Sequence, residues 1–277
     1  MLDGEWALII FTILTQLAVG IWLVAVTLRI LIAGILNQAI ASQLTRPAIL
    51  MVGPIMCVAL LISLFHLGSP MMAFGSIANL GTSWLSREIV FSGLFLFLWI
   101  AAYVNYRKAN TGNILGWITT ILGLLAVFSM ASIYHSTPIP AWTNGSTYIG
   151  FFATTIILGL FANVTFVGFA AKGTNINQDV VKLLWKVSLF ALAVVIIQLF
   201  FVANNAGGNT YSSPLIFHGL LMLVGGLITV AFLYKCSKKQ SVTLPLTVIY
   251  STFIIIFVGE IIGRYFFYAS AVPIAIG

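Results

Sequence analysis

Charged residues are scarce in this chain, and their scarcity excludes most soluble folds. Lys, Arg, Asp and Glu together make up 6% of the 277 residues, whereas soluble globular proteins carry roughly 25%. Hydrophobic residues make up 61%, and the mean hydropathy is +1.13. A chain this apolar cannot cover itself with a polar surface, so we expect its solvent to be lipid. The apolar runs are long and unbroken rather than alternating, which predicts membrane helices rather than barrel strands.

Cysteine is also nearly absent, which removes two further kinds of site. Cys57 lies in an apolar run and Cys236 in a basic loop, so the sequence predicts neither a disulfide framework nor a metal centre. The formal charge of +7 is spread over short loops. We therefore interpret it as a signal of membrane orientation and expect no nucleic-acid partner.

Eight apolar segments are long enough to cross the hydrocarbon core of a bilayer. They are residues 7–28, 47–67, 88–106, 113–135, 148–171, 183–203, 214–235 and 245–268. The connections between them are short, which leaves no room for an inserted soluble domain. The sequence therefore predicts an all-α, polytopic membrane protein with residues 1–277 forming a single integral membrane domain.

The cations predict the orientation of these helices. Ten of the twelve Lys and Arg residues, all but Arg87 and Arg264, lie in or near alternate connections at one end of the predicted bundle. Because cytoplasmic loops carry an excess of Lys and Arg, we expect this end to face the cytoplasm. With an even number of spans, both termini then lie on the outer, periplasmic side.

Most of the remaining titratable residues fall at the outer ends of the spans. They are His66, His135, His218, Arg87, Glu88, Glu260 and Arg264. Ionisable groups inside membrane spans are functional candidates by default, although the default is weaker near the edge of a span. The pattern predicts that titratable chemistry is concentrated near the outer membrane face.

His66 and Glu88 are the first pair of candidates. His66 ends span 2 just before Gly68 and Pro70 break the helix, and histidine exchanges protons near neutral pH. Glu88 starts span 3 at about the same depth, where the helix dipole stabilises a carboxylate. The alternative for His66 is an interfacial histidine bonded to loop backbone. For the neighbouring Arg87, an anchor to lipid phosphate is the simplest role.

The segment "VGEIIGRYFFY" in span 8 is the second candidate. Glu260 and Arg264 are four residues apart and can pair on one helix face. Gly259 and Gly263 form a small-xxx-small pattern, which allows a neighbouring helix to approach closely. The two residues form an ion pair that helps span 8 to pack, or a polar wall of a site shared with spans 2 and 3, and both readings can hold together.

Other polar and aromatic side chains have simpler expected roles. Asn163 and Gln198 lie mid-span, where we expect hydrogen bonds between helices. Trp6, Trp84 and Trp142 lie at the outer boundary, where tryptophan usually anchors a protein to the interface, although one of them could line a pocket for a ring-shaped ligand.

Three motifs carry a resemblance to a known family. "HLGSPMMAF" after span 2, "LSREI" at the start of span 3 and "GEIIGRYFFY" in span 8 resemble the membrane anchor subunit of dimethyl sulfoxide reductase, the DmsC family. The length, the eight spans and the outer termini are similar too. The resemblance implies a multi-pass protein of the bacterial cytoplasmic (inner) membrane that oxidises menaquinol in anaerobic respiration.

The resemblance also implies partners and a site. The anchor would hold an iron–sulfur subunit and a molybdopterin catalytic subunit on the outer face, so that these cofactors lie in the partners and this chain carries no haem. By motif position, the quinol site would comprise His66, Gly68, Phe74 and Ser76, with Glu88 from span 3. Family members have an arginine where this chain has Met72, and Arg87 or Arg264 could supply that charge.

Joining the resemblance to the chemistry gives a first mechanism. Oxidation of a quinol releases two electrons and two protons, and the protons need acceptors within hydrogen-bond reach. We expect His66 to take a proton from one quinol oxygen and Glu88 to relay a proton outward. Glu260 and Arg264 would shape the pocket.

Three alternatives stay open from the sequence. A haem b-carrying quinol anchor would need His66 to face His135 or His218 across the bundle. A secondary transporter would place its substrate near the bilayer midplane, where this chain has almost no charge. A purely structural anchor would need none of these residues for quinol oxidation.

Overall fold

The protein is a bundle of eight long helices in the part of the chain that the structure describes. The computed structural model describes residues 6–64, 79–107, 113–205, 212–239 and 241–270. The helices are α1 (Trp6–Ile35), α2 (Gln38–Ser63), α4 (Trp84–Arg107), α5 (Asn113–His135), α6 (Ser146–Ala170), α7 (Gln178–Asn205), α8 (Ser212–Ser237) and α9 (Leu246–Ala269). Each contains a stretch apolar and long enough to cross a membrane, which confirms the prediction of a polytopic helical protein.

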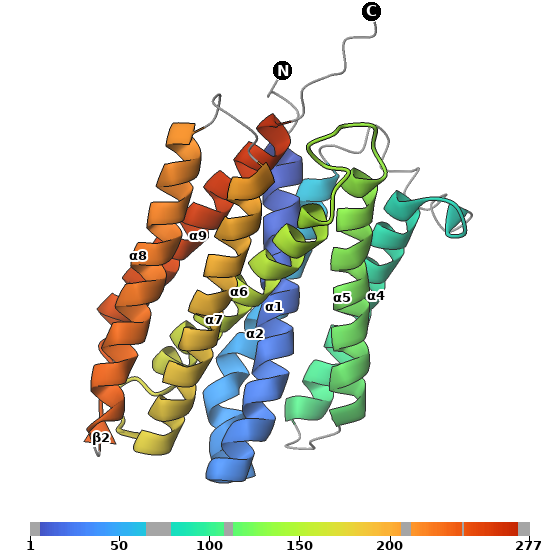
Figure 1. The fold of residues 1–277 in the computed structure, drawn as a ribbon. Helices are drawn as coiled ribbons and strands as arrows, with labels where there is room; N and C mark the ends of the chain where they lie inside the picture. Colours follow the sequence, from blue (N-terminus) through green and yellow to red (C-terminus); the bar gives the residue numbers. More distant parts are fainter. Residues whose placement is uncertain (1–5, 65–78, 108–112, 206–211, 240, 271–277) are drawn as a thin grey trace, which may run out of the picture.

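Two helices form the centre of the bundle. Figure 1 shows α1 running through the middle, with α4 and α5 on one side and α7, α8 and α9 on the other. Helix α1 packs against α2, α5, α6 and α9, and α6 packs against α1, α2, α5, α7 and α9. Because α1 and α6 are largely enclosed, their side chains are surrounded by protein instead of lipid.

Small residues set the crossing of α1 and α6. A Cβ atom added to Gly159 would collide with the backbone of Gly20, so the two helices approach at van der Waals contact. Close by, Asn163 Nδ2 donates to the carbonyl oxygen of Ile21 at 3.1 Å. This bond confirms the expected role of Asn163 between helices.

The connection between α1 and α2 differs from the prediction. Helix α2 begins at Gln38 rather than at residue 47, because Asn37 caps it, accepting a hydrogen bond from the backbone N–H of Ile40 at 2.9 Å. Pro47 lies inside the helix and does not mark its start. Arg29 and Arg46 therefore lie within α1 and α2, not in a loop.

A short strand pair closes the end of the bundle where α8 ends. Strands β1 (Ile176–Asn177) and β2 (Ser241–Val242) pair antiparallel and join the α6–α7 connection to the α8–α9 connection. The predicted all-α class omitted this pair. It holds two connections together and leaves the helical architecture unchanged.

Candidate functional site

A cavity of about 160 Å³ lies at the end of the bundle where α1 starts and α9 ends. Its walls come from α6, α7, α8, α9 and the connection before α6, and much of the lining is apolar. The large apolar side chains are Phe151, Val202, Leu215, Phe266 and Phe267. Cavities of roughly 150 Å³ hold a benzene-sized ring, so the volume suits a flat aromatic group.

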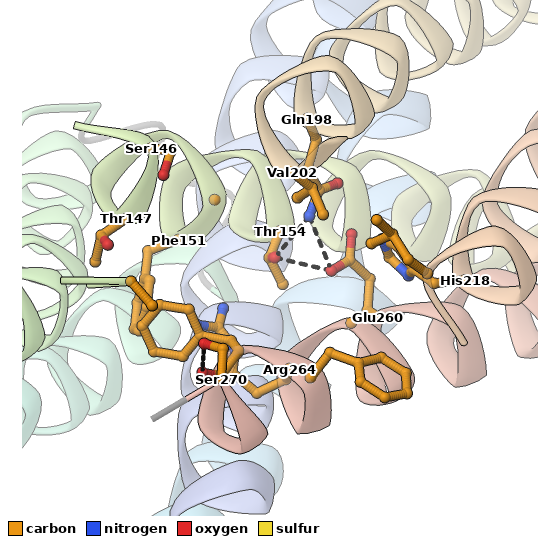
Figure 2. A pocket seen from close by; sticks show the side chains of 16 residues that line it. Ser146, Thr147, Phe151, Thr154, Gln198, Val202, His218, Glu260, Arg264 and Ser270 are labelled. Carbon is orange, nitrogen blue, oxygen red and sulfur yellow. Dashed lines mark hydrogen bonds between the residues drawn. The ribbon is translucent and has the colours of Figure 1, made fainter. Parts of the chain in front are cut away.

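Glu260 supplies the main polar feature of the cavity. Its side chain is 2% exposed, and its Oε2 atom accepts a hydrogen bond from Thr154 Oγ1 at 2.8 Å. Gln198 Nε2 donates to the same carboxylate oxygen and to Thr154 Oγ1, both at 3.3 Å. Figure 2 shows these three side chains meeting, one from each of α6, α7 and α9. The expectation that Gln198 bonds between helices is thus confirmed.

Two oxygens of this cluster have spare accepting capacity. Glu260 Oε1 and Gln198 Oε1 are buried and have no hydrogen-bond partner among the described residues. Unsatisfied buried polar atoms are rare and costly. Both residues line the cavity, so a bound molecule with hydroxyl groups would satisfy them.

His218 lies beside Glu260 and packs against α9 (Figure 2). Its Nδ1 atom lies 2.7 Å from the carbonyl oxygen of Gly259. A carbonyl oxygen can only accept, so Nδ1 carries a proton, and in the neutral ring Nε2 is left as an acceptor. A Cβ atom on Gly263 would lie 2.7 Å from the His218 ring. The small-xxx-small prediction is therefore confirmed: Gly263 makes room for the His218 ring, and Gly259 makes room for Met222 on the same helix.

Of the two alternatives for Glu260 and Arg264, the ion pair is not formed among the described residues, where Lys182 and Asp179 form a salt bridge at 3.0 Å. Arg264 Nη2 instead donates to Gln16 Oε1 on α1 at 2.8 Å. The Arg264 guanidinium also lies 3.8 Å from the centre of the Phe151 ring, a stabilising cation–π contact.

Four-residue spacing places Glu260 and Arg264 on one helix face, but each side chain is hydrogen-bonded to another helix. The partners of Glu260 come from α6 and α7. The polar wall around Glu260 is therefore shared with α6 and α7.

A tyrosine pair lies behind the aromatic wall of the cavity. The hydroxyl groups of Tyr134 and Tyr268 are 2.7 Å apart, and both side chains are buried. Arg264 interacts electrostatically with both. Glu88, which is 5% exposed, interacts electrostatically with the same two hydroxyl groups. Glu88 and Arg264, predicted from separate motifs, thus both lie within electrostatic range of this tyrosine pair.

Arg87 is occupied by its own connection. Its Nε and Nη2 atoms donate to the carbonyl oxygens of Leu80 and Gly81, both at 2.8 Å, and its guanidinium lies 4.1 Å from the centre of the Trp84 ring. These contacts fix the turn before α4.

Trp142 is buried, not a membrane anchor. Its side chain is 8% exposed, and Nε1 donates to the carbonyl oxygen of Phe267 at 2.8 Å. Its ring stacks on that of Phe267, with the centroids 5.3 Å apart. The only signal for Trp142 in the sequence is its position at the end of a span. That position does not distinguish a ring that faces lipid from a ring that packs inside the protein.

Four predicted site residues, His66, Gly68, Phe74 and Ser76, lie outside the described residues. Conversely, the structure adds Thr154, Gln198 and His218 to the site. The signal in the sequence for Gln198 and His218 was a polar side chain within an apolar span. Thr154 gave no signal, because threonine is common in membrane helices.

Comparison with known proteins gives the family of the whole chain. A family model described as "DMSO reductase anchor subunit (DmsC)" matches residues 2–270. The chain belongs to this family. It is thus a multi-pass membrane protein of the DmsC family, and the resemblance seen in three short motifs is confirmed over nearly the full length.

Three curated relatives agree with this assignment. The C subunit of anaerobic dimethyl sulfoxide reductase from Haemophilus influenzae is 29% identical over 214 residues, covering 75% of this chain and 72% of the relative. The corresponding C subunit from Escherichia coli is 27% identical over 276 residues, covering 95% and 94%. The anaerobic dimethyl sulfoxide reductase subunit YnfH from Escherichia coli is 30% identical over 164 residues, covering 56% and 55%.

Proposed function

We propose that this DmsC-family chain is the quinol-oxidising anchor subunit of a dimethyl sulfoxide reductase-type complex in the bacterial cytoplasmic membrane. The observation that carries the proposal is the apolar cavity with a buried carboxylate, Glu260, whose Oε1 atom has no partner among the described residues. A hydroquinone combines a flat apolar ring with two hydroxyl donors. The cavity offers the complementary surface.

The lining residues fit a quinol head group. Phe151 and Phe267 provide aromatic walls. Glu260 Oε1 and Gln198 Oε1 can accept hydrogen bonds, and His218 Nε2 is an acceptor in the neutral ring. The cluster lies at one end of the membrane helices, so the isoprenoid tail of a menaquinol could remain in the lipid.

Oxidation of the quinol requires groups that accept its protons and a path that carries these protons out of the cavity. Menaquinol loses two electrons and two protons as it becomes menaquinone, and a carboxylate or imidazole within hydrogen-bond reach can take a proton. Glu260 and Arg264 shape the cavity. The Tyr134–Tyr268 pair leads from Arg264 towards Glu88, which would relay a proton outward.

His66 keeps its proposed role as the acceptor at one quinol oxygen, with Gly68, Phe74 and Ser76 beside it. This part of the proposal rests on the motif resemblance. The electrons would pass to the iron–sulfur partner subunit, and the molybdopterin subunit would carry out the terminal reduction.

The orientation follows from charge. Among the described residues, nine of the eleven cations lie towards the end of the bundle opposite the cavity, and Arg87 and Arg264 are the exceptions. From the positive-inside rule we expect the cavity and both termini to face the periplasm. Protons and electrons from menaquinol would both be released there, so turnover would move no net charge across the membrane.

The experiment that tests the function uses membranes with and without this chain, with the partner subunits present in both. Sulfoxide reduction is assayed with a menaquinol analogue and, separately, with an artificial dye that donates directly to the partners. We expect loss of the quinol reaction alone. Unchanged quinol activity without this chain would reduce its role to a tether and refute the proposal.

Single variants then locate the site. His66→Ala and Glu88→Gln should each lower quinol-dependent turnover while dye-dependent turnover is retained. The control is Asp179→Asn, since Asp179 lies at the other end of the bundle and pairs with Lys182. Full quinol activity in both His66→Ala and Glu88→Gln would remove them from the mechanism.

A further inference from the structure

A second cavity lies between α1, α2 and α4, at the opposite end of these helices from the proposed quinol site. It has a volume of about 290 Å³ and is lined by Arg29, Ser42, Arg46, Ile49, Tyr103 and Tyr106. Its lining contains two cations, three hydroxyl groups and no acidic side chain, whereas Glu260 lines the first cavity. Such a lining suits an anion.

Arg29 is the central group of this cavity and is 3% exposed. Its Nη2 atom donates to Ser42 Oγ at 2.9 Å, and its guanidinium lies 4.4 Å from the centre of the Tyr106 ring. Its Nε atom has no hydrogen-bond partner among the described residues, and the same is true of the Tyr106 hydroxyl oxygen. The site therefore has spare donors beside a buried positive charge.

No carboxylate in the part of the chain that the structure describes neutralises the charge of Arg29. The chain has five acidic residues. Asp179 pairs with Lys182, and Glu260 lies in the first cavity. Glu88 precedes Tyr103 on α4 by fifteen positions, which separates them by about 22 Å along the axis at 1.5 Å per residue.

The other two acids, Asp3 and Glu5, lie outside the described residues and precede the start of α1, whereas Arg29 is near its end. A buried charge without a counter-charge is strongly destabilising. An anion bound in the cavity would supply the counter-charge that no described carboxylate provides to Arg29.

We propose that this cavity binds the phosphate group of an anionic phospholipid. Arginine presents several N–H donors that match phosphate oxygens, and the hydroxyls of Ser42, Tyr103 and Tyr106 can donate as well. Arg46 is exposed and adds a second positive charge at the mouth.

A lipid is favoured over a free anion by the position of the cavity among lipid-facing side chains. Ile100 and Val104 are 52% and 48% exposed and flank Tyr103 on α4, Ile100 being one helical turn away. A headgroup in the cavity would leave its acyl chains free to lie along this apolar surface.

The test uses the purified complex after exchange into lipid-free detergent. Binding is followed by native mass spectrometry and by the midpoint of thermal unfolding. The added probes are phosphatidylglycerol, phosphatidylcholine or inorganic phosphate. We expect phosphatidylglycerol to bind and raise the midpoint, phosphatidylcholine to bind more weakly, and inorganic phosphate to give no comparable rise.

Variants connect the effect to the cavity. Arg29→Gln should weaken phosphatidylglycerol binding by at least about tenfold, since it removes the charged donor of several hydrogen bonds. Arg46→Gln should weaken binding too, and it keeps the proposal testable if Arg29→Gln does not fold, because Arg46 is exposed. Lys186→Gln, at an exposed cation on α7 outside the cavity, is the matched control.

Three outcomes would overturn the proposal. Equal protection by inorganic phosphate alone would reject the lipid as the source of the phosphate. Equal binding of phosphatidylglycerol and phosphatidylcholine would reject selection of an anion. Unchanged phosphatidylglycerol binding in both arginine variants would reject the cavity itself.

Discussion

Replacement of Glu260 by glutamine tests the proposed quinol cavity most directly. Glutamine has nearly the same shape, and its carbonyl oxygen can still accept from Thr154 and Gln198, which donate to Glu260 Oε2 at 2.8 and 3.3 Å. The amide nitrogen then replaces Oε1, the oxygen that has no partner among the described residues. A quinol hydroxyl would therefore meet a donor in place of a charged acceptor.

The magnitude follows from the hydrogen bond that is lost. A hydrogen bond to a charged group contributes about 1.5–3 kcal/mol, and about 1.4 kcal/mol corresponds to a tenfold change. We expect kcat/KM for a menaquinol analogue to fall roughly 10- to 150-fold. If Glu260 also takes the proton in the transition state, kcat itself should fall by about 10²- to 10⁴-fold.

The assay compares quinol-dependent and dye-dependent sulfoxide reduction by the same membrane complex. Dye activity should stay at the wild-type level, because the variant keeps the packing around residue 260 and leaves the partner subunits intact. Asp179→Asn again serves as the control for loss of an acidic charge. A Glu260→Gln complex with wild-type kcat/KM for the quinol analogue would show that the cavity does not hold the reacting head group.

Two further predictions concern the surroundings of the site. Gly263→Ala should lower the free energy of unfolding by about 1–3 kcal/mol, because its Cβ would lie 2.7 Å from the His218 ring. Thermal unfolding of the solubilised complex measures this loss, and Gly93→Ala, with open space around the new methyl group, should show none. A reduced-minus-oxidised visible spectrum of the complex should lack a b-type haem α band, and such a band assigned to this chain would revive the bis-histidine alternative.

The two cavities of the bundle suit different kinds of ligand. The first is a mainly apolar pocket with a carboxylate that has spare accepting capacity, and the second is a polar pocket with a cation that has spare donating capacity. A hydroxyl-bearing ring suits the first and a phosphate the second. The two proposals rest on different residues at opposite ends of the helices, so a variant in one cavity leaves the other intact.

Several features of the protein were determined by the sequence alone. A chain with 6% charged residues cannot form a water-facing surface, so the membrane class and the apolar helices follow from composition and run length. The spacing of Gly259 and Gly263 predicted a close helix contact, since both fall on one face of a single helix. The enrichment of titratable residues at one end was equally visible, because depth in the membrane follows position along a helix.

Only the tertiary structure decided which side chains meet. Glu260 bonds to Thr154, 106 residues away, and Arg264 to Gln16, 248 residues away, whereas the sequence left open whether the two pair with each other. The burial of Arg29 and Trp142 depended likewise on which helix faces turn inward. Hydropathy and four-residue spacing are properties of one helix, whereas a polar side chain inside a bundle is satisfied by whichever helix packs against it, and that choice is made by the packing of all eight.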